Sequence, residues 1–82
     1  MLLVTDKPYT LKNKDASKAK LEVLVQATLN GGTATFSIKN KDAPSFSVVK
    51  TLTDVPELIR VPYQGDYKVT LTGSAVVYGD ET

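Results

Sequence analysis

A two-residue alternation of apolar side chains constrains this chain more than any other feature of its sequence. Successive side chains of a β-strand point to opposite faces, so an apolar residue at every second position predicts a strand with one buried face. The pattern occurs over residues 21–29 and again over residues 33–38. The Asn30-Gly31-Gly32 between these two runs tolerates the positive φ of a tight turn. We therefore expect a β-hairpin. Its inward side chains would be Leu21, Val23, Val25, Ala27 and Leu29, then Ala34, Phe36 and Ile38.

The rest of the chain is predicted to form further short strands separated by turn residues. Val, Thr and Ile make up 22 of the 82 residues, and β-branched side chains favour a pleated sheet. Seven or eight strands at roughly 8–12-residue spacing indicate an all-β protein. We expect one domain over residues 1–82, a small antiparallel β-sandwich of immunoglobulin-like or jelly-roll-like form. The further strands are expected at 2–5, 9–11, 45–52, 58–61, 67–72 and 74–78.

The chain has no cysteine, histidine or tryptophan, which removes most catalytic and metal chemistry. Disulfides and thiolate sites need cysteine, and histidine is the commonest general base and metal ligand. The local carboxylate pairs, Asp54 with Glu57 and Asp80 with Glu81, lack the spacing of a calcium loop. We read Asp54 as a turn residue and expect a protein that is not an enzyme, with no cofactor, no metal and no catalytic residue.

Charge is distributed unevenly along a chain whose net charge is only +1. Residues 1–50 carry +4 and residues 51–82 carry −3, so copies could attract one another unless folding mixes the two halves. The lysine-rich run 12–20 either contacts an acidic or phosphate-bearing partner or keeps a loop soluble. The charge balance does not favour nucleic-acid binding. No apolar stretch is long enough for a membrane span or a signal peptide, which favours synthesis in a cytoplasm.

Several apolar residues fall where a strand in a two-layer protein would present polar ones. They indicate either a second buried surface, such as a subunit contact, or a core made irregular by bulges. The opening apolar segment could also add to the edge of a neighbouring sheet. The candidate interface residues are Met1, Leu2, Leu3, Val4, Leu24, Val49, Val77 and Tyr78.

The tyrosines allow a structural and a functional interpretation. Tyr67 enters a strand directly after the turn Gln64-Gly65-Asp66, as does the tyrosine corner of immunoglobulin-like domains, whose hydroxyl ties back to a nearby connection. We expect Tyr67 to be structural. Tyr9 and Tyr63, or Tyr78, could instead form an aromatic platform for a sugar ring.

The closing part of the chain resembles small β-sandwich virion proteins of tailed bacteriophages, namely head-decoration (cement) and fibre-associated proteins. The resemblance rests on the pattern Gly65-x-Tyr67-x-Val69, then Thr-Gly-Ser-Ala at 72–75, then an apolar strand, and covers about a quarter of the chain. It implies a non-enzymatic structural protein of the virion that works as a symmetric oligomer, often a trimer, bound to a capsid or tail protein.

These observations favour a capsid decoration or accessory virion protein that acts through oligomeric protein–protein contacts. A small all-β domain without disulfide or metal commonly gains stability by association, which also indicates a homo-oligomer. The alternative is a carbohydrate-binding or adhesion module that uses exposed tyrosines.

Overall fold

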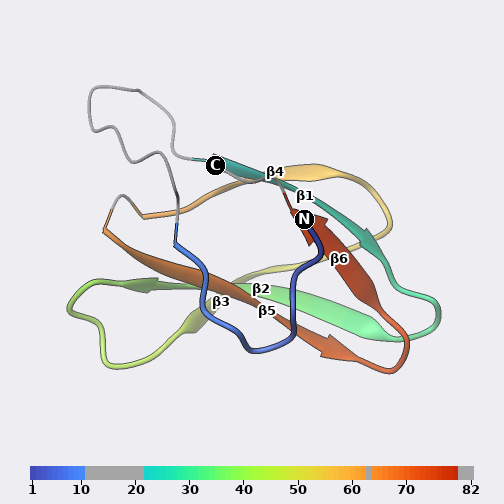
Figure 1. The fold of residues 1–82 in the computed structure, drawn as a ribbon, viewed down its shortest axis with the longest axis horizontal. Helices are drawn as coiled ribbons and strands as arrows, with labels where there is room; N and C mark the ends of the chain where they lie inside the picture. The colour runs from blue at the N-terminus through green and yellow to red at the C-terminus, as the bar shows by residue number, and fades with distance from the viewer. Residues whose placement is uncertain (11–21, 63, 80–82) are drawn as a thin grey trace.

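All regular elements in the described part of the chain are β-strands, as the composition predicts (Figure 1). The computed structural model describes residues 1–10, 22–62 and 64–79, and these contain no helix. The strands are β1 (Glu22–Thr28), β2 (Thr33–Asn40), β3 (Ser47–Thr51), β4 (Glu57–Arg60), β5 (Gly65–Thr72) and β6 (Val76–Gly79).

Six strands occur in the described residues, fewer than the seven or eight expected. The difference lies in the first ten residues. In place of the two strands predicted there, the structure has two isolated β-bridges, Leu2 with Tyr78 and Tyr9 with Tyr67. Asp6 has a positive φ of 59°, which turns the chain between the two bridges. Pro8 lacks a backbone N–H and cannot donate to a strand ladder.

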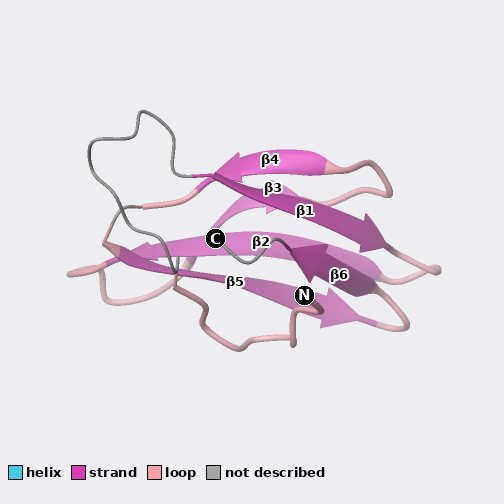
Figure 2. Cartoon of the chain, turned by 45° about the horizontal axis from the view of Figure 1, so that its top comes forward, coloured by secondary structure: helices cyan, strands magenta, loops and turns pink. Residues whose placement is uncertain are grey.

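The strands form two small antiparallel sheets (Figure 2). Sheet A has the order β4-β1-β6, and sheet B has the order β3-β2-β5. Alternate residues of β1 are buried, and in β2 Ala34 and Phe36 are buried together with the adjacent Ser37, so each sheet has one mainly apolar face. Buried side chains from both sheets belong to one core cluster, whose largest fully buried members are Phe36, Leu3, Val23, Val25, Val69 and Val77.

The expected hairpin between β1 and β2 is wrong in its pairing, although the expected turn is present. Asn30 and Gly31 have φ values of 50° and 83°, and the Gly32 N–H donates to the Leu29 carbonyl at 2.7 Å. Two successive positive φ values are those of a type I′ turn. The turn nevertheless joins two sheets, because β4 and β6 occupy both edges of β1 while β3 and β5 occupy both edges of β2. Each strand therefore has no edge left for the other.

A second turn between the sheets packs directly on the first. The Thr33 N–H donates to the Thr72 hydroxyl at 2.9 Å, and the two threonine hydroxyls lie 2.6 Å apart. The Asn30 side chain donates to the Ser74 carbonyl at 3.1 Å. Gly32 lies so close to Thr72 that a Cβ on this glycine would stand 2.1 Å from the Thr72 carbonyl oxygen. The two turns thus form one tightly packed end of the molecule.

The first ten residues, here called the N-terminal strap, lie along one edge of both sheets. Met1 and Leu3 exchange backbone hydrogen bonds with β6: Leu3 N–H donates to Val77 at 2.9 Å, and Gly79 N–H donates to Met1 at 2.8 Å. Further along, Tyr9 and Tyr67 exchange two backbone bonds of 2.8 and 2.9 Å. The strap therefore covers the free edges of β6 and β5.

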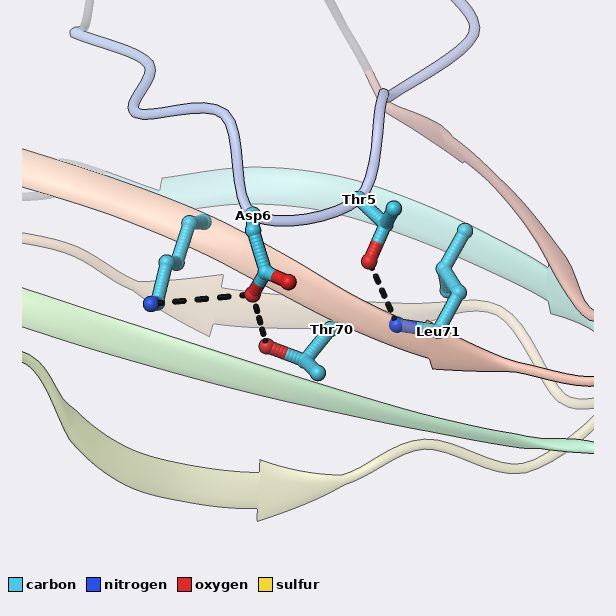
Figure 3. A network of polar contacts seen from close by, with 5 residues as sticks. Thr5, Asp6, Thr70 and Leu71 are labelled. Atoms are coloured by element: carbon cyan, nitrogen blue, oxygen red, sulfur yellow. Dashed lines mark hydrogen bonds and ion pairs between the residues drawn. The ribbon is translucent and has the colours of Figure 1, made fainter.

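The turn of the strap is pinned to β5 by side chains (Figure 3). The Thr5 hydroxyl accepts from the Leu71 N–H at 2.9 Å, and the Asp6 carboxylate accepts from the Thr70 hydroxyl at 2.8 Å. The Lys68 ammonium lies 3.7 Å from the same Asp6 oxygen. These contacts hold the segment with its positive φ against the sheet.

Candidate interaction surface

The outward face of sheet A carries a group of exposed apolar side chains. Leu24 and Leu58 are direct partners across β1 and β4, and Tyr78 lies between its partners Gln26 and Leu2. Partners in an antiparallel ladder point to the same face, and Leu24 and Gln26 lie two residues apart on one strand. The four apolar side chains therefore share the outer face. We call them the sheet A stripe: Leu2, Leu24, Leu58 and Tyr78, which are 53%, 40%, 63% and 53% exposed.

A shallow hollow of about 140 Å³ adjoins this stripe. Met1 and Pro56 border it together with Leu24 and Tyr78, and Gln26 supplies a polar group. Isolated apolar residues are common on protein surfaces, but a contiguous group on one face is typical of an interaction site. The outer face of sheet A is therefore the best-supported contact surface among the described residues.

The predicted interface residues divide between the surface and the core. Six are exposed: Met1, Leu2, Val4, Leu24, Val49 and Tyr78. The outward placement expected for Leu3 and Val77 is wrong, because they are 2% and 0% exposed and belong to the core. In β6 the inward positions are Val77 and Gly79, and Leu3 packs on Gly79, where a Cβ would stand 3.1 Å from Leu3 Cδ1.

Leu58 was missed by the sequence reasoning, although a signal for it exists. Ile59 and Val61 are both buried, and they flank an exposed Arg60. In a strand this pattern places Leu58 on the outer face with Arg60. The alternation of β4 alone, followed to its start, would have added Leu58 to the candidates.

An open groove runs between the edge strands β3 and β4 beside the sheet A stripe. Its volume is about 540 Å³. The Lys50 ammonium spans it and lies 3.5 Å from one Glu57 carboxylate oxygen, while the other Glu57 oxygen is buried without a hydrogen-bond partner among the described residues. Because the Lys50 side chain is half exposed, an ion pair of this kind adds little stability. The lining residues are Val49, Lys50, Glu57, Leu58, Ile59 and Arg60.

The aromatic residues of the strap and sheet B form a stack. The Tyr67 ring lies 5.4 Å from that of Phe36 and 5.8 Å from that of Tyr9. Tyr67 is 3% exposed, which fits a structural residue, and in the described part of the chain its hydroxyl forms no hydrogen bond. The hydrogen bond to a nearby connection that was expected of Tyr67 is made by Tyr9, whose hydroxyl accepts the Val4 N–H at 2.8 Å.

The sugar platform suggested by the sequence is not assembled from Tyr9, which is half-buried in this stack. Tyr63 lies outside the described residues, as do the lysine-rich run 12–20 and the pair Asp80 and Glu81. Tyr78 is the exposed tyrosine among the residues described, and it belongs to the sheet A stripe.

Burial raises the pKa of the Tyr67 hydroxyl above its ordinary value of 10.0, and the neighbouring Tyr9 acts in the same direction. The unfolded chain ionises Tyr67 near pH 10, whereas the folded chain does so only at higher pH. Stability is therefore intact below about pH 10 and falls as the pH rises from there through the folded pKa. Tyr67→Phe keeps the ring and removes this dependence.

We expect the free energy of unfolding to fall less steeply above about pH 10 in Tyr67→Phe than in the native chain. Urea unfolding of both proteins between about pH 8 and pH 11 measures the difference, and lysine ionisation is common to both. Parallel curves over the whole range would contradict a buried Tyr67.

The described residues contain no group of three or more acidic, histidine or cysteine side chains placed to hold a metal ion. Asp54 accepts the Leu29 N–H at 2.8 Å and so supports the turn after β1, in keeping with its reading as a turn residue. No helix in the described parts is long and apolar enough to cross a membrane. Comparison with known proteins found no matching family model, no matching curated protein and no matching solved structure.

Proposed function

We propose that this chain is a non-enzymatic structural protein that works through protein–protein contacts as a homo-oligomer. The sheet A stripe is the observation that supports this function. Four large apolar side chains, each at least 40% exposed, share one face of a protein of 8.9 kDa. Covering such a face removes apolar surface from water at roughly 25 cal/mol per Å², a driving force for association.

We further propose that the protein is made in a host cytoplasm and resides in a virus particle, as a capsid decoration or accessory virion protein bound to a capsid or tail protein. The resemblance of residues 65–77 to phage decoration proteins supports this setting, together with the small size of the chain. That resemblance taken alone favours a trimer, whereas the strand contact argued below from the edge of sheet A gives a dimer.

The two sheets are proposed to form the layers of a small β-sandwich. The core cluster, which draws on both sheets, supports this arrangement. The neighbours β1–β4 and β2–β5 correspond to the B–E and C–F neighbours of an immunoglobulin domain. The last strand departs from that plan, since β6 pairs with β1 where an immunoglobulin domain places its first strand.

Mass spectrometry of purified particles tests the virion setting. Phage particles are isolated from the lysate in which the chain is produced and washed at high salt to remove loosely bound protein. We expect the chain to remain in the washed particles in a constant ratio to the major capsid protein. Its presence in the lysate but absence from the particles would contradict the proposal.

A carbohydrate-binding function is the second candidate, and Tyr78 favours it. This ring is 53% exposed and borders the hollow lined by Met1, Leu24 and Gln26. Exposed aromatic rings with a neighbouring polar group can stack on sugars. A glycan array probed with the native chain and with Tyr78→Ala tests it: binding by the native chain alone would support this candidate, and no binding by either would remove it.

A further inference from the structure

The two sheets differ in how their edges are protected. The strap covers the edges of β5 and β6, whereas β3 and β4 are edge strands with no neighbour beyond them among the described residues. β3 has a bulge at Val49: its neighbours Lys50 and Val48 pair with the consecutive residues Phe36 and Ser37 of β2, which leaves Val49 without an opposite residue. Such bulges hinder pairing with another chain. The ladder of β4 is regular, so its outer edge is the better template for an added strand.

The apolar surface of sheet A reaches this unprotected edge. Leu24 and Leu58 stand opposite each other in one row, and Leu58, in the edge strand, is 63% exposed. An edge strand leaves the N–H and C=O groups of every second residue without a partner in its own sheet. The β4 edge thus combines open backbone groups with a large apolar side chain.

The order of residues in β4 suits pairing with itself. Two antiparallel copies of a strand are related by a twofold axis perpendicular to the sheet, which keeps outer faces on the same side. If Leu58 stands opposite Leu58 of the second copy, the leucine row continues unbroken from Leu24 across the axis to its symmetry mate. Centring the axis on Ile59 would instead place Leu58 opposite an arginine.

Charge also favours the antiparallel arrangement. β4 begins with Glu57 and ends with Arg60. In the Leu58-centred register, Arg60 of one copy stands opposite Pro56 of the other, next to Glu57. Antiparallel pairing therefore keeps the two Arg60 ends apart, whereas a parallel pairing in register would place them opposite each other; Arg60 and Glu57 themselves point to opposite faces of the sheet.

We propose that β4 pairs antiparallel with β4 of a second copy of this chain, with the twofold axis at Leu58, and that sheet A thereby becomes a six-stranded sheet shared by two protomers. Main-chain hydrogen bonds and the four-leucine row hold the contact. The inference rests on the proposed self-association and adds its partner strand, register and symmetry. A twofold contact of this kind gives dimers.

Disulfide cross-linking tests the register, since the native chain has no cysteine. Opposite residues in an antiparallel pair have Cβ atoms about 4.5–5.5 Å apart, close enough for a disulfide after a small adjustment. We expect Leu58→Cys to form covalent dimers under mild oxidation at least about tenfold faster than Val48→Cys. Val48 is the matched control, because it is 62% exposed and lies on the other edge strand, β3.

A second variant keeps the test decisive if the cysteine disturbs the contact. Leu58→Lys places a charge at the edge without touching the core, and we expect it to shift the native oligomer to monomer while Val48→Lys does not. Equal cross-linking rates for the two cysteine variants, or a native trimer, would overturn the β4 pairing and leave the proposed function standing. A native chain that stays monomeric would overturn both.

Discussion

Phe36→Ala is expected to lower the free energy of unfolding by about 3–5 kcal/mol. Phe36 is 0% exposed at the centre of β2, and its ring stacks on Tyr67 at 5.4 Å between centroids. The substitution leaves a cavity and removes the base of the stack that also holds Tyr9 of the strap. A chain of 82 residues has a total stability of roughly 4–12 kcal/mol, so the variant would be close to unfolding.

Chemical denaturation at 25 °C measures this loss, with Val48→Ala as the control. Val48 is an apolar residue that is 62% exposed, and surface substitutions usually change stability by less than about 0.5 kcal/mol. A loss below about 1 kcal/mol for Phe36→Ala would contradict a core shared by the two sheets.

Gly32→Ala is expected to destabilise the protein by roughly 2–4 kcal/mol. A Cβ at this position would stand 2.1 Å from the Thr72 carbonyl oxygen, and this neighbour is backbone, which cannot rotate away. The two turns would have to separate, which breaks the hydrogen bonds of Thr33 and Asn30 to the second turn.

Gly31→Asn is the matched control for this turn. Gly31 has open space around it and a φ of 83°, a conformation that asparagine tolerates better than most residues. Thermal unfolding of both variants separates the two effects: we expect a large fall in the melting temperature for Gly32→Ala and a small one for Gly31→Asn. Equal falls would mean that the two turns do not pack together.

The strands of this protein were largely predictable from local pattern, but their partners were not. The alternation over β1 and the positive φ at Asn30 and Gly31 are local properties, and both are confirmed; in β2 the alternation holds at Ala34 and Phe36 but fails at Ser37, which is buried. Whether the turn makes a hairpin or joins two sheets depends on which other strands reach β1 and β2. Those long-range contacts leave no mark in the residues of the turn.

The candidate surface was predictable in part for the same reason. Leu24 and Tyr78 lie on the outer face as the sequence indicated. Leu3 was placed outward because nothing local shows that the strap lays this side chain on Gly79 of β6. Sequence spacing gives the face of each side chain within its own strand, whereas the burial of a face depends on the neighbouring segment.

The chain has no cysteine for a disulfide, and its described residues form no metal site. The protection of the sheet edges therefore matters for the stability of this small protein. The strap closes the side formed by β5 and β6 with backbone hydrogen bonds and the Asp6 contacts. On the side formed by β3 and β4, the Lys50–Glu57 ion pair links the two edge strands across the groove. The proposed association at that side would add burial to the core that the two sheets share.

Light scattering coupled to size-exclusion chromatography tests the central claim, self-association, most directly. The native chain is measured over a range of concentrations beside Leu58→Lys. We predict a mass of about twice the 8.9 kDa of one chain for the native protein and a mass of one chain for the variant. A native protein that remains at the mass of one chain at every concentration would contradict the account.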